Sequence, residues 1–223
     1  MSEITLSEYD ALYKWLTPRA RKHFLGIYEN LLISSTSADV GSLLVCSANR
    51  GEGTTSVAMG IALAVSTQRN VPVLLVDGNY HDPQVCNMLR TYGPAGIGDI
   101  LAGRIDINSV AQPTMVPCLA VMGTGVLPAS HISLLEAPNL RNLLKKMNQQ
   151  YPLVVIDGPA VNLFPESVLY SSQVDRVLLV VHSGVTRIPV VSAALSRLSE
   201  AKRIEVILNR RLYPIPHSIY RRL

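Results

Sequence analysis

The chain has 223 residues, of which 48% are hydrophobic and 16% are charged, and its formal net charge at pH 7 is +4. This composition excludes an intrinsically disordered chain, and the length suffices for one domain with a substantial buried core. The longest apolar runs, such as residues 57–65, are too short to cross a bilayer. The first ten residues lack the basic and then apolar layout of a secretory signal. We therefore expect a cytoplasmic protein.

The chain begins with two predicted helices. Residues 7–16 open with Ser7 and Asp10, which resemble a capping box, and a second helix continues from about Pro18. We expect both helices to cover a face or an edge of a sheet, with recruitment of a partner as the alternative. The chain is then a single domain, divided into N-terminal helices (residues 1–40), an α/β domain (41–209) and a basic tail (210–223).

Six short apolar runs alternate with helical patterns along the rest of the chain. The runs are rich in Val, Ile and Leu and nearly continuous, which is typical of parallel strands buried on both faces. Strands are expected at residues 42–47, 71–77, 118–123, 153–157, 176–182 and 204–209, and helices at residues 55–68, 133–150 and 189–201. This order predicts a doubly wound, mostly parallel α/β sheet with helices on both faces.

The turn after the first strand, "SANRGEGTTS" (residues 47–56), resembles a phosphate-binding loop. In the pattern G-x-x-x-x-G-K-[ST], backbone N–H groups hold the phosphates and the lysine reaches the terminal ones. Here Thr55 has the position of the magnesium-binding hydroxyl, but Thr54 stands where the lysine should be. The candidate nucleotide-binding residues of the loop are Arg50, Gly51, Glu52, Gly53, Thr54, Thr55 and Ser56.

Three polar residues end other predicted strands. Asp77 and Asp157 each follow a buried run, where a carboxylate can hold magnesium directly or through water, and they are also the candidate catalytic groups. The alternative is that each aspartate caps the loop that follows it. Because the two occur together with the glycine loop, a nucleotide site with Thr55, Asp77 and Asp157 as metal ligands is favoured. Asn209 ends the last strand, where it either contacts an adenine ring or caps the strand.

The histidines and cysteines show no metal-ligand spacing. His81, His131 and His182 are dispersed, so we interpret them as ordinary surface or loop residues. The three cysteines, Cys46, Cys86 and Cys118, are expected to be buried free thiols.

From about Phe24 to Asn209 the chain resembles the cytoplasmic domain of bacterial tyrosine kinases, P-loop proteins of capsule and exopolysaccharide export that are related to the MinD and ParA ATPases. The segment "CSANRGEGTTSVAMGIALAV" is similar to the Walker A strand, loop and helix of that family. "VPVLLVDGNYHDP" looks like its second acidic motif, "GIGDILAG" like its short helix, and "PLVVIDGPA" like its Walker B motif. "VDRVLLVVHSGVTR" and "VILNR" match its last strands. The resemblance implies a P-loop fold and a site for ATP or ADP with Mg²⁺.

The chain also departs from this family pattern. Thr54 replaces the catalytic lysine, and Asn79 replaces the second aspartate of the acidic motif, whose basic pair reads His81 and Asp82. The family's E-x-x-R-x-x-R segment, which mediates ring assembly, is lost, and its C-terminal tyrosine cluster is reduced. The ring-assembly positions are Lys22, Leu25 and Tyr28, and the remaining tyrosines are Tyr213 and Tyr220.

These departures predict at most weak binding of ATP or ADP with Mg²⁺ and little kinase chemistry, with no cofactor needed for the fold. The first hypothesis is a nearly inactive partner or regulator of a membrane polysaccharide co-polymerase, a chain-length-determinant-like protein, peripheral at the inner face of the bacterial inner membrane. The second is a working tyrosine autokinase that takes the missing charge from Arg50 or from its partner. The third, a MinD- or ParA-like positioning ATPase on a membrane or DNA, is disfavoured because Asn49 and Thr54 replace that group's two lysines.

The resemblance and the charges also bear on partners. An octameric ring and a nucleic-acid partner are not expected. The basic tail favours an anionic membrane surface, nucleic acid or an acidic partner, of which we prefer the membrane, and a solvated chain end is the alternative.

Overall fold

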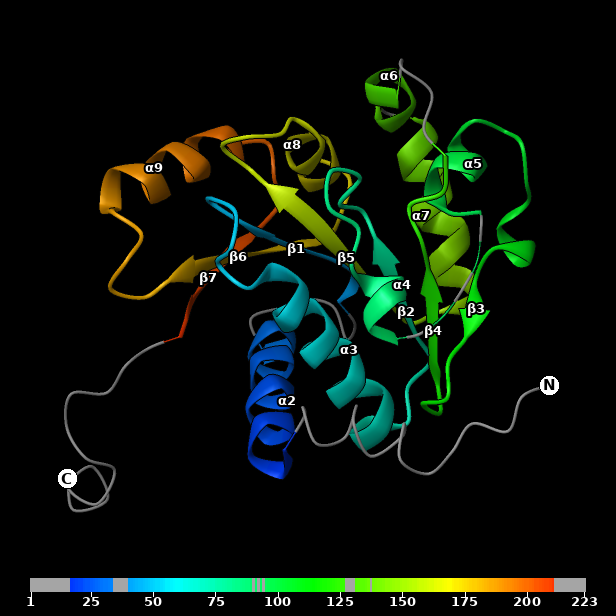
Figure 1. Ribbon diagram of the computed structural model, residues 1–223, viewed down its shortest axis with the longest axis horizontal. Helices are drawn as coiled ribbons and strands as arrows, with labels where there is room; N and C mark the ends of the chain where they lie inside the picture. Colours follow the sequence, from blue (N-terminus) through cyan, green and yellow to red (C-terminus); the bar gives the residue numbers. More distant parts are fainter. Residues whose placement is uncertain are drawn as a thin grey trace.

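The computed structural model describes residues 17–33, 40–89, 91, 93, 95–126, 131–136 and 138–210. Its centre is a seven-stranded sheet with the order β3-β4-β2-β5-β1-β6-β7, in which only β3 runs antiparallel to its neighbour (Figure 1). The strands are β1 (Gly41–Ser47), β2 (Val73–Asp77), β3 (Gln112–Pro113), β4 (Leu119–Met122), β5 (Leu153–Ala160), β6 (Arg176–His182) and β7 (Ile204–Asn209). The predicted fold class, a doubly wound and mostly parallel sheet, is confirmed.

The sheet is buried on both faces because helices pack against each side. The described helices are α2 (Pro18–Ile33), α3 (Thr54–Arg69), α4 (Val85–Leu89), α5 (Ile97–Leu101), α6 (His131–Leu135), α7 (Asn139–Gln150), α8 (Glu166–Ser171) and α9 (Ile188–Arg197), with a short 3₁₀ turn, η1 (Ile107–Ser109). One apolar core joins the sheet to α2, α3 and α4, and the other joins it to the helices from α5 to α9. Every residue of β2 and β5 is buried, as their continuous apolar sequence requires.

The helix α2 lies along α3 on one face of the sheet (Figure 1). Tyr28 and Leu31 of α2 are buried in the core below. The second predicted helix therefore packs beside α3 and contributes two side chains to this core. The first predicted helix, residues 7–16, lies outside the described residues.

Several predicted elements differ from the observed ones. The helix expected over residues 133–150 is two helices, α6 and α7, because Pro138 lacks the N–H that a continuous helix needs and stands at the N-cap of α7. The strand β5 runs to Ala160, three residues beyond the predicted end. The short elements α4, α8 and β3 have too few residues to show a period. Cys118, expected to be buried, is exposed at a positive φ of 60° in the turn before β4.

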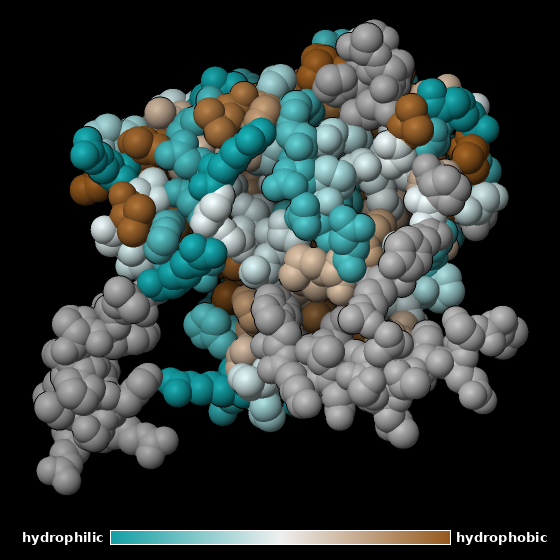
Figure 2. Space-filling view, viewed as in Figure 1, coloured by the Kyte–Doolittle hydropathy of each residue, from teal (hydrophilic) through white to brown (hydrophobic). Residues whose placement is uncertain are grey.

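The surface is mostly hydrophilic across the middle of the face drawn in Figure 2, with apolar side chains over α9 and the loop before it. Val185 and Ile188 of that region are 65% and 84% exposed. Single exposed apolar side chains are ordinary for a folded domain. Within the described part of the chain, no helix is both long enough and apolar enough to cross a membrane.

Candidate functional site

The glycine loop connects β1 to α3 at the carboxyl edge of the sheet. Its backbone passes through positive φ angles of 80° at Gly51 and 95° at Gly53, which residues with a Cβ rarely adopt. The helix α3 begins directly afterwards, at Thr54, so its first N–H groups and its positive dipole end face the loop. A pocket of about 250 Å³ opens here, and it is lined by Ser47, Arg50, Gly51, Gly53, Thr54, Thr55, Ser56, Asn79, Asp82, Gly158, Pro159, Ala160, Phe164 and Arg210. This arrangement can hold a phosphate chain.

Glu52, a residue of the loop that is only 3% exposed, anchors the loop to its neighbours. Its carboxylate accepts a hydrogen bond from the Asn49 N–H at 3.0 Å and another from the Thr186 hydroxyl. Asn209 Nδ2 donates to the Glu52 carbonyl oxygen at 2.8 Å. The loop is therefore tied to the segment before α9 and to the end of β7.

Two predicted nucleotide-binding residues thus have structural contacts instead of a place on the pocket wall. Glu52 lines a neighbouring hollow with His182 and Thr186, and Asn209 lines none of the described pockets. The Asn209 amide also accepts the Arg210 N–H at 2.9 Å. These contacts agree with the strand-capping interpretation of Asn209, and its contact with adenine stays a prediction.

Asp157 lies near the carboxyl end of β5 and is 1% exposed. Neither of its carboxylate oxygens has a hydrogen-bond partner among the described residues. Burial raises the pKa of Asp157 to about 8, the charges of Asp77 and Asp82 add to this, and the Thr55 hydroxyl opposes it. Two buried oxygens without partners beside a threonine hydroxyl fit a hard divalent cation such as Mg²⁺, which prefers oxygen ligands.

Asp77 pairs with Asp157 across the neighbouring strands β2 and β5. Its carboxylate accepts hydrogen bonds from the Val85 N–H at 2.9 Å and from the Asn79 N–H at 3.2 Å. Burial raises the pKa of Asp77 to about 6, although these backbone hydrogen bonds lower it. Asp77 therefore caps the loop after β2, which was the alternative interpretation, and it is close enough to influence Asp157. Its role as a metal ligand stays a prediction.

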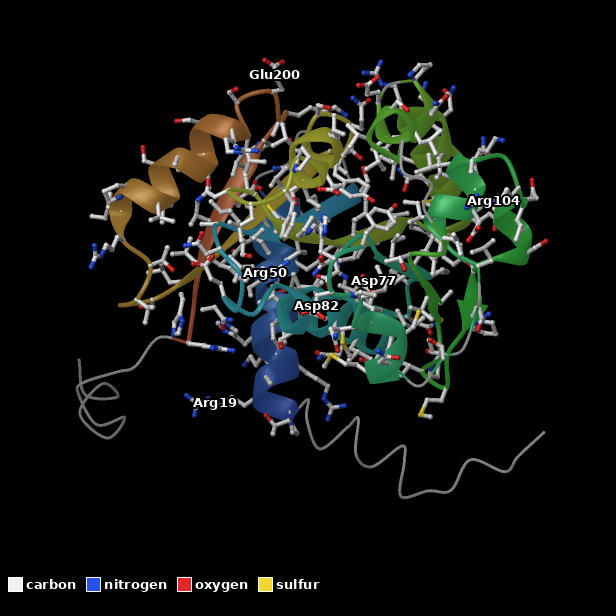
Figure 3. The ribbon with its side chains drawn as sticks, turned by 45° about the horizontal axis from the view of Figure 1, so that its top comes forward. Arg19, Arg50, Asp77, Asp82, Arg104 and Glu200 are labelled. Carbon is white, nitrogen blue, oxygen red and sulfur yellow. The ribbon has the colours of Figure 1, made fainter. Side chains whose placement is uncertain are left out.

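The site also contains residues that sequence reasoning did not single out. The Phe164 ring stacks on the His81 imidazole with 3.7 Å between centroids, and His81 Nε2 lies 2.9 Å from Glu166 Oε1. The Arg50 guanidinium carbon lies 4.9 Å from the centroid of the same Phe164 ring. Arg50 and Asp82, which both line the pocket, are labelled in Figure 3. Phe164 and Glu166 both come shortly after the end of β5. Because ligands bind near the carboxyl ends of parallel strands, this closeness in the sequence could have indicated both residues.

The interpretation of His81 as an ordinary surface histidine was therefore incomplete, since it forms part of the pocket's support. His182 lies beside the glycine loop in the neighbouring hollow. For His131 the structure gives no side-chain description. No group of three His, Cys, Asp or Glu side chains suited to a metal occurs within the described residues.

The fold and the glycine loop together define a class, the P-loop α/β proteins, and the structural comparisons agree. MinD from Pyrococcus horikoshii, solved with Mg-ADP, matches with a TM-score of 0.62 at 19% identity over 81% of this chain and 76% of that one, which shows the fold. The chimerical protein CapA2B2 matches with a TM-score of 0.82 at 25% identity, covering 94% of this chain and 92% of that one. No family model matches the sequence.

Within this class, the sequence comparisons find similarity to bacterial tyrosine-protein kinases. The tyrosine-protein kinase CpsD of Streptococcus agalactiae is 23% identical over 195 residues, which cover 86% of this chain and 84% of that protein. The tyrosine-protein kinase wzc of Salmonella typhi is 28% identical over 170 residues, 76% of this chain but only 22% of that longer protein. Over most of its length the chain is thus similar to the bacterial tyrosine-protein kinases, and its fold is like that of MinD.

Proposed function

We propose that this chain is a nucleotide-binding relative of the bacterial tyrosine kinases that has lost most of its kinase chemistry. It acts as a partner or regulator of a membrane polysaccharide co-polymerase, a chain-length-determinant-like protein, in capsule or exopolysaccharide export. The observation that carries this proposal is Thr54, an uncharged residue at the start of α3 where the terminal phosphates would lie. A charge-assisted hydrogen bond of the missing kind contributes about 1.5–3 kcal/mol, or about ten- to a hundredfold in affinity.

The remaining groups support weak binding of ATP or ADP. The N–H groups of the glycine loop and of the first turn of α3 would hold phosphate oxygens, and the Thr55 hydroxyl with Asp157 would hold Mg²⁺. When bound, Mg²⁺ neutralises phosphate charge. Asp77 holds the loop that carries Asn79 and Asp82 to the pocket wall.

The proposed partner and location rest on the similarity to CpsD and to the putative tyrosine-protein kinase CapB of Staphylococcus aureus, which is 22% identical over 84% of this chain. A cytoplasmic chain at the inner face of the bacterial inner membrane would meet such a partner. We propose no nucleic-acid partner.

The test is calorimetry of the purified chain with Mg-ATP and Mg-ADP, followed by a phosphate-transfer assay with and without the co-polymerase. We expect binding in the range of weak complexes and no autophosphorylation in either assay. Absence of binding at millimolar nucleotide contradicts the nucleotide site. Autophosphorylation that appears with the partner favours the second candidate, a working autokinase, which the two arginines on the pocket wall support.

A further inference from the structure

The phosphate pocket lacks a cation at the usual place in its loop. Thr54 donates one hydrogen bond but has no charge, whereas a di- or triphosphate brings several negative charges into the pocket. Among the described residues that line the pocket, the basic ones are Arg50 and Arg210. Of these, Arg50 belongs to the phosphate loop itself, between β1 and Gly51.

Arg50 is exposed and takes part in no ion pair or side-chain hydrogen bond with a described residue. Its guanidinium carbon lies over the face of the Phe164 ring, 4.9 Å from the centroid, a distance at which a guanidinium is attracted to an aromatic ring. Such a contact leaves the N–H groups at the guanidinium edge available to another acceptor.

Neighbouring side chains hold the Phe164 ring in place. His81 stacks against it with an interplanar angle of 18°, and the Glu166 carboxylate next to the imidazole has a side chain only 1% exposed. The buried Glu166 carboxylate therefore positions the His81 ring, which stacks on the Phe164 ring. The Phe164 ring in turn contacts the Arg50 guanidinium at the pocket wall. These residues come from the loops after β1, β2 and β5, which end at the same edge of the sheet.

We propose that Arg50, positioned by Phe164, is the phosphate-binding cation of this pocket and binds the terminal phosphate of a nucleoside di- or triphosphate. Arginine suits this role because its planar fork donates two parallel hydrogen bonds to phosphate oxygens. Arg210 adds a second positive charge on the wall. The inference rests on the proposed function of the pocket as a nucleotide site.

The test compares the affinities of the full-length chain and its variants for ATP, ADP and AMP, each with excess Mg²⁺, by calorimetry. We expect Arg50→Ala to weaken ATP binding about ten- to a hundredfold and AMP binding much less, because AMP lacks the terminal phosphates. Arg50→Lys keeps the charge without the fork and recovers part of the loss. The matched control is Arg187→Ala, since Arg187 is exposed but lines the neighbouring hollow and not the phosphate pocket.

The positioning role of Phe164 has its own readout. Phe164→Leu should weaken ATP binding several-fold in the native chain and have no further effect in the Arg50→Ala background, whereas a general loss of structure would weaken both. Thermal melting of each variant checks folding. If the native chain binds ATP and the affinity of the Arg50→Ala variant for ATP is within about twofold of the native value, the inference is wrong and the proposed function stands. If the native chain binds none of the three nucleotides, both are wrong.

Discussion

Asp157 is almost completely buried, and neither of its carboxylate oxygens has a hydrogen-bond partner among the described residues. In the folded chain its pKa is about 8, against 3.8 for an ordinary aspartate. The unfolded chain therefore releases this proton at lower pH than the folded chain does. Between these two values the folded state binds more protons than the unfolded state, so the stability that the neutral acid contributes is full below about pH 4 and falls as pH rises towards 8.

The prediction is that Asp157→Asn, which keeps the shape and removes the ionisation, stabilises the chain at neutral pH. In the native chain the free energy of unfolding should fall by up to about 1.4 kcal/mol per pH unit through this range, and the variant should lack this component. Urea unfolding at pH 5, 6, 7 and 8 measures both. Parallel curves for the two proteins would show that Asp157 is not the titrating group.

A second prediction at the scale of single residues concerns Thr54. Thr54→Lys places a positive charge at the start of α3, beside the loop glycines, and should tighten Mg-ATP binding by about tenfold or more. Calorimetry of the full chain measures the change. The control, Ser196→Lys, adds the same charge at an exposed position on α9. Equal affinities for the native chain and Thr54→Lys would show that the loop geometry does not direct residue 54 at the phosphates.

At the scale of elements, the contact between α2 and α3 depends on the absence of a side chain at Gly60. A Cβ there would come within 2.5 Å of the Phe24 ring, while a Cβ at Gly26 of α2 would meet nothing within 4 Å. Both glycines lie inside helices, where alanine is normally the better residue.

The two positions therefore make a matched pair. Gly60→Ala should lower the free energy of unfolding by about 1–3 kcal/mol because it forces the helices apart. Gly26→Ala should raise it by about 0.5–1 kcal/mol. Denaturant unfolding measures both, and Phe24→Leu combined with Gly60→Ala should recover part of the loss. A stabilising Gly60→Ala would mean that the Phe24 ring turns aside at little cost.

The elements also show what the sequence could and could not predict. Continuous apolar runs predicted the central strands, and the rule that parallel strands end at one edge brought the glycine loop, Asp77 and Asp157 together. The contact between His81 and Glu166 joins residues 85 positions apart and depends on β2 and β5 being neighbours, which no local pattern reveals. Nor does a local pattern show that the Asp77 carboxylate accepts hydrogen bonds from backbone N–H groups.

For the whole molecule, we predict that the chain does not form an octameric ring. At the three positions where the resembled family has ring-assembly charges, Lys22 is exposed with reversed charge, Leu25 packs partly against the core and Tyr28 is 5% exposed below α3. These side chains cannot form the expected ion pairs with another copy. Light scattering at micromolar concentration should give a mass well below eight subunits, and a mass of eight subunits would contradict the prediction. A smaller oligomer is compatible with it.

The last prediction concerns membrane attachment. Residues 211–223 lie outside the described part of the chain, but the sequence from Arg210 onwards contains four arginines, Arg210, Arg211, Arg221 and Arg222, among apolar residues. Near an anionic membrane surface each basic residue contributes about 1 kcal/mol, so four would give reversible attachment.

We expect the chain to sediment with phosphatidylcholine vesicles that contain phosphatidylglycerol and not with phosphatidylcholine alone. Arg221→Glu with Arg222→Glu should abolish this binding without changing the melting temperature. Lys145→Glu with Lys146→Glu changes the charge equally on the exposed face of α7 and should have a smaller effect. Because the attraction is electrostatic, raising the salt concentration should weaken the binding of the native chain. If the tail variant instead melts at a lower temperature and still binds the anionic vesicles, the arginines support the fold and the membrane surface is not their partner.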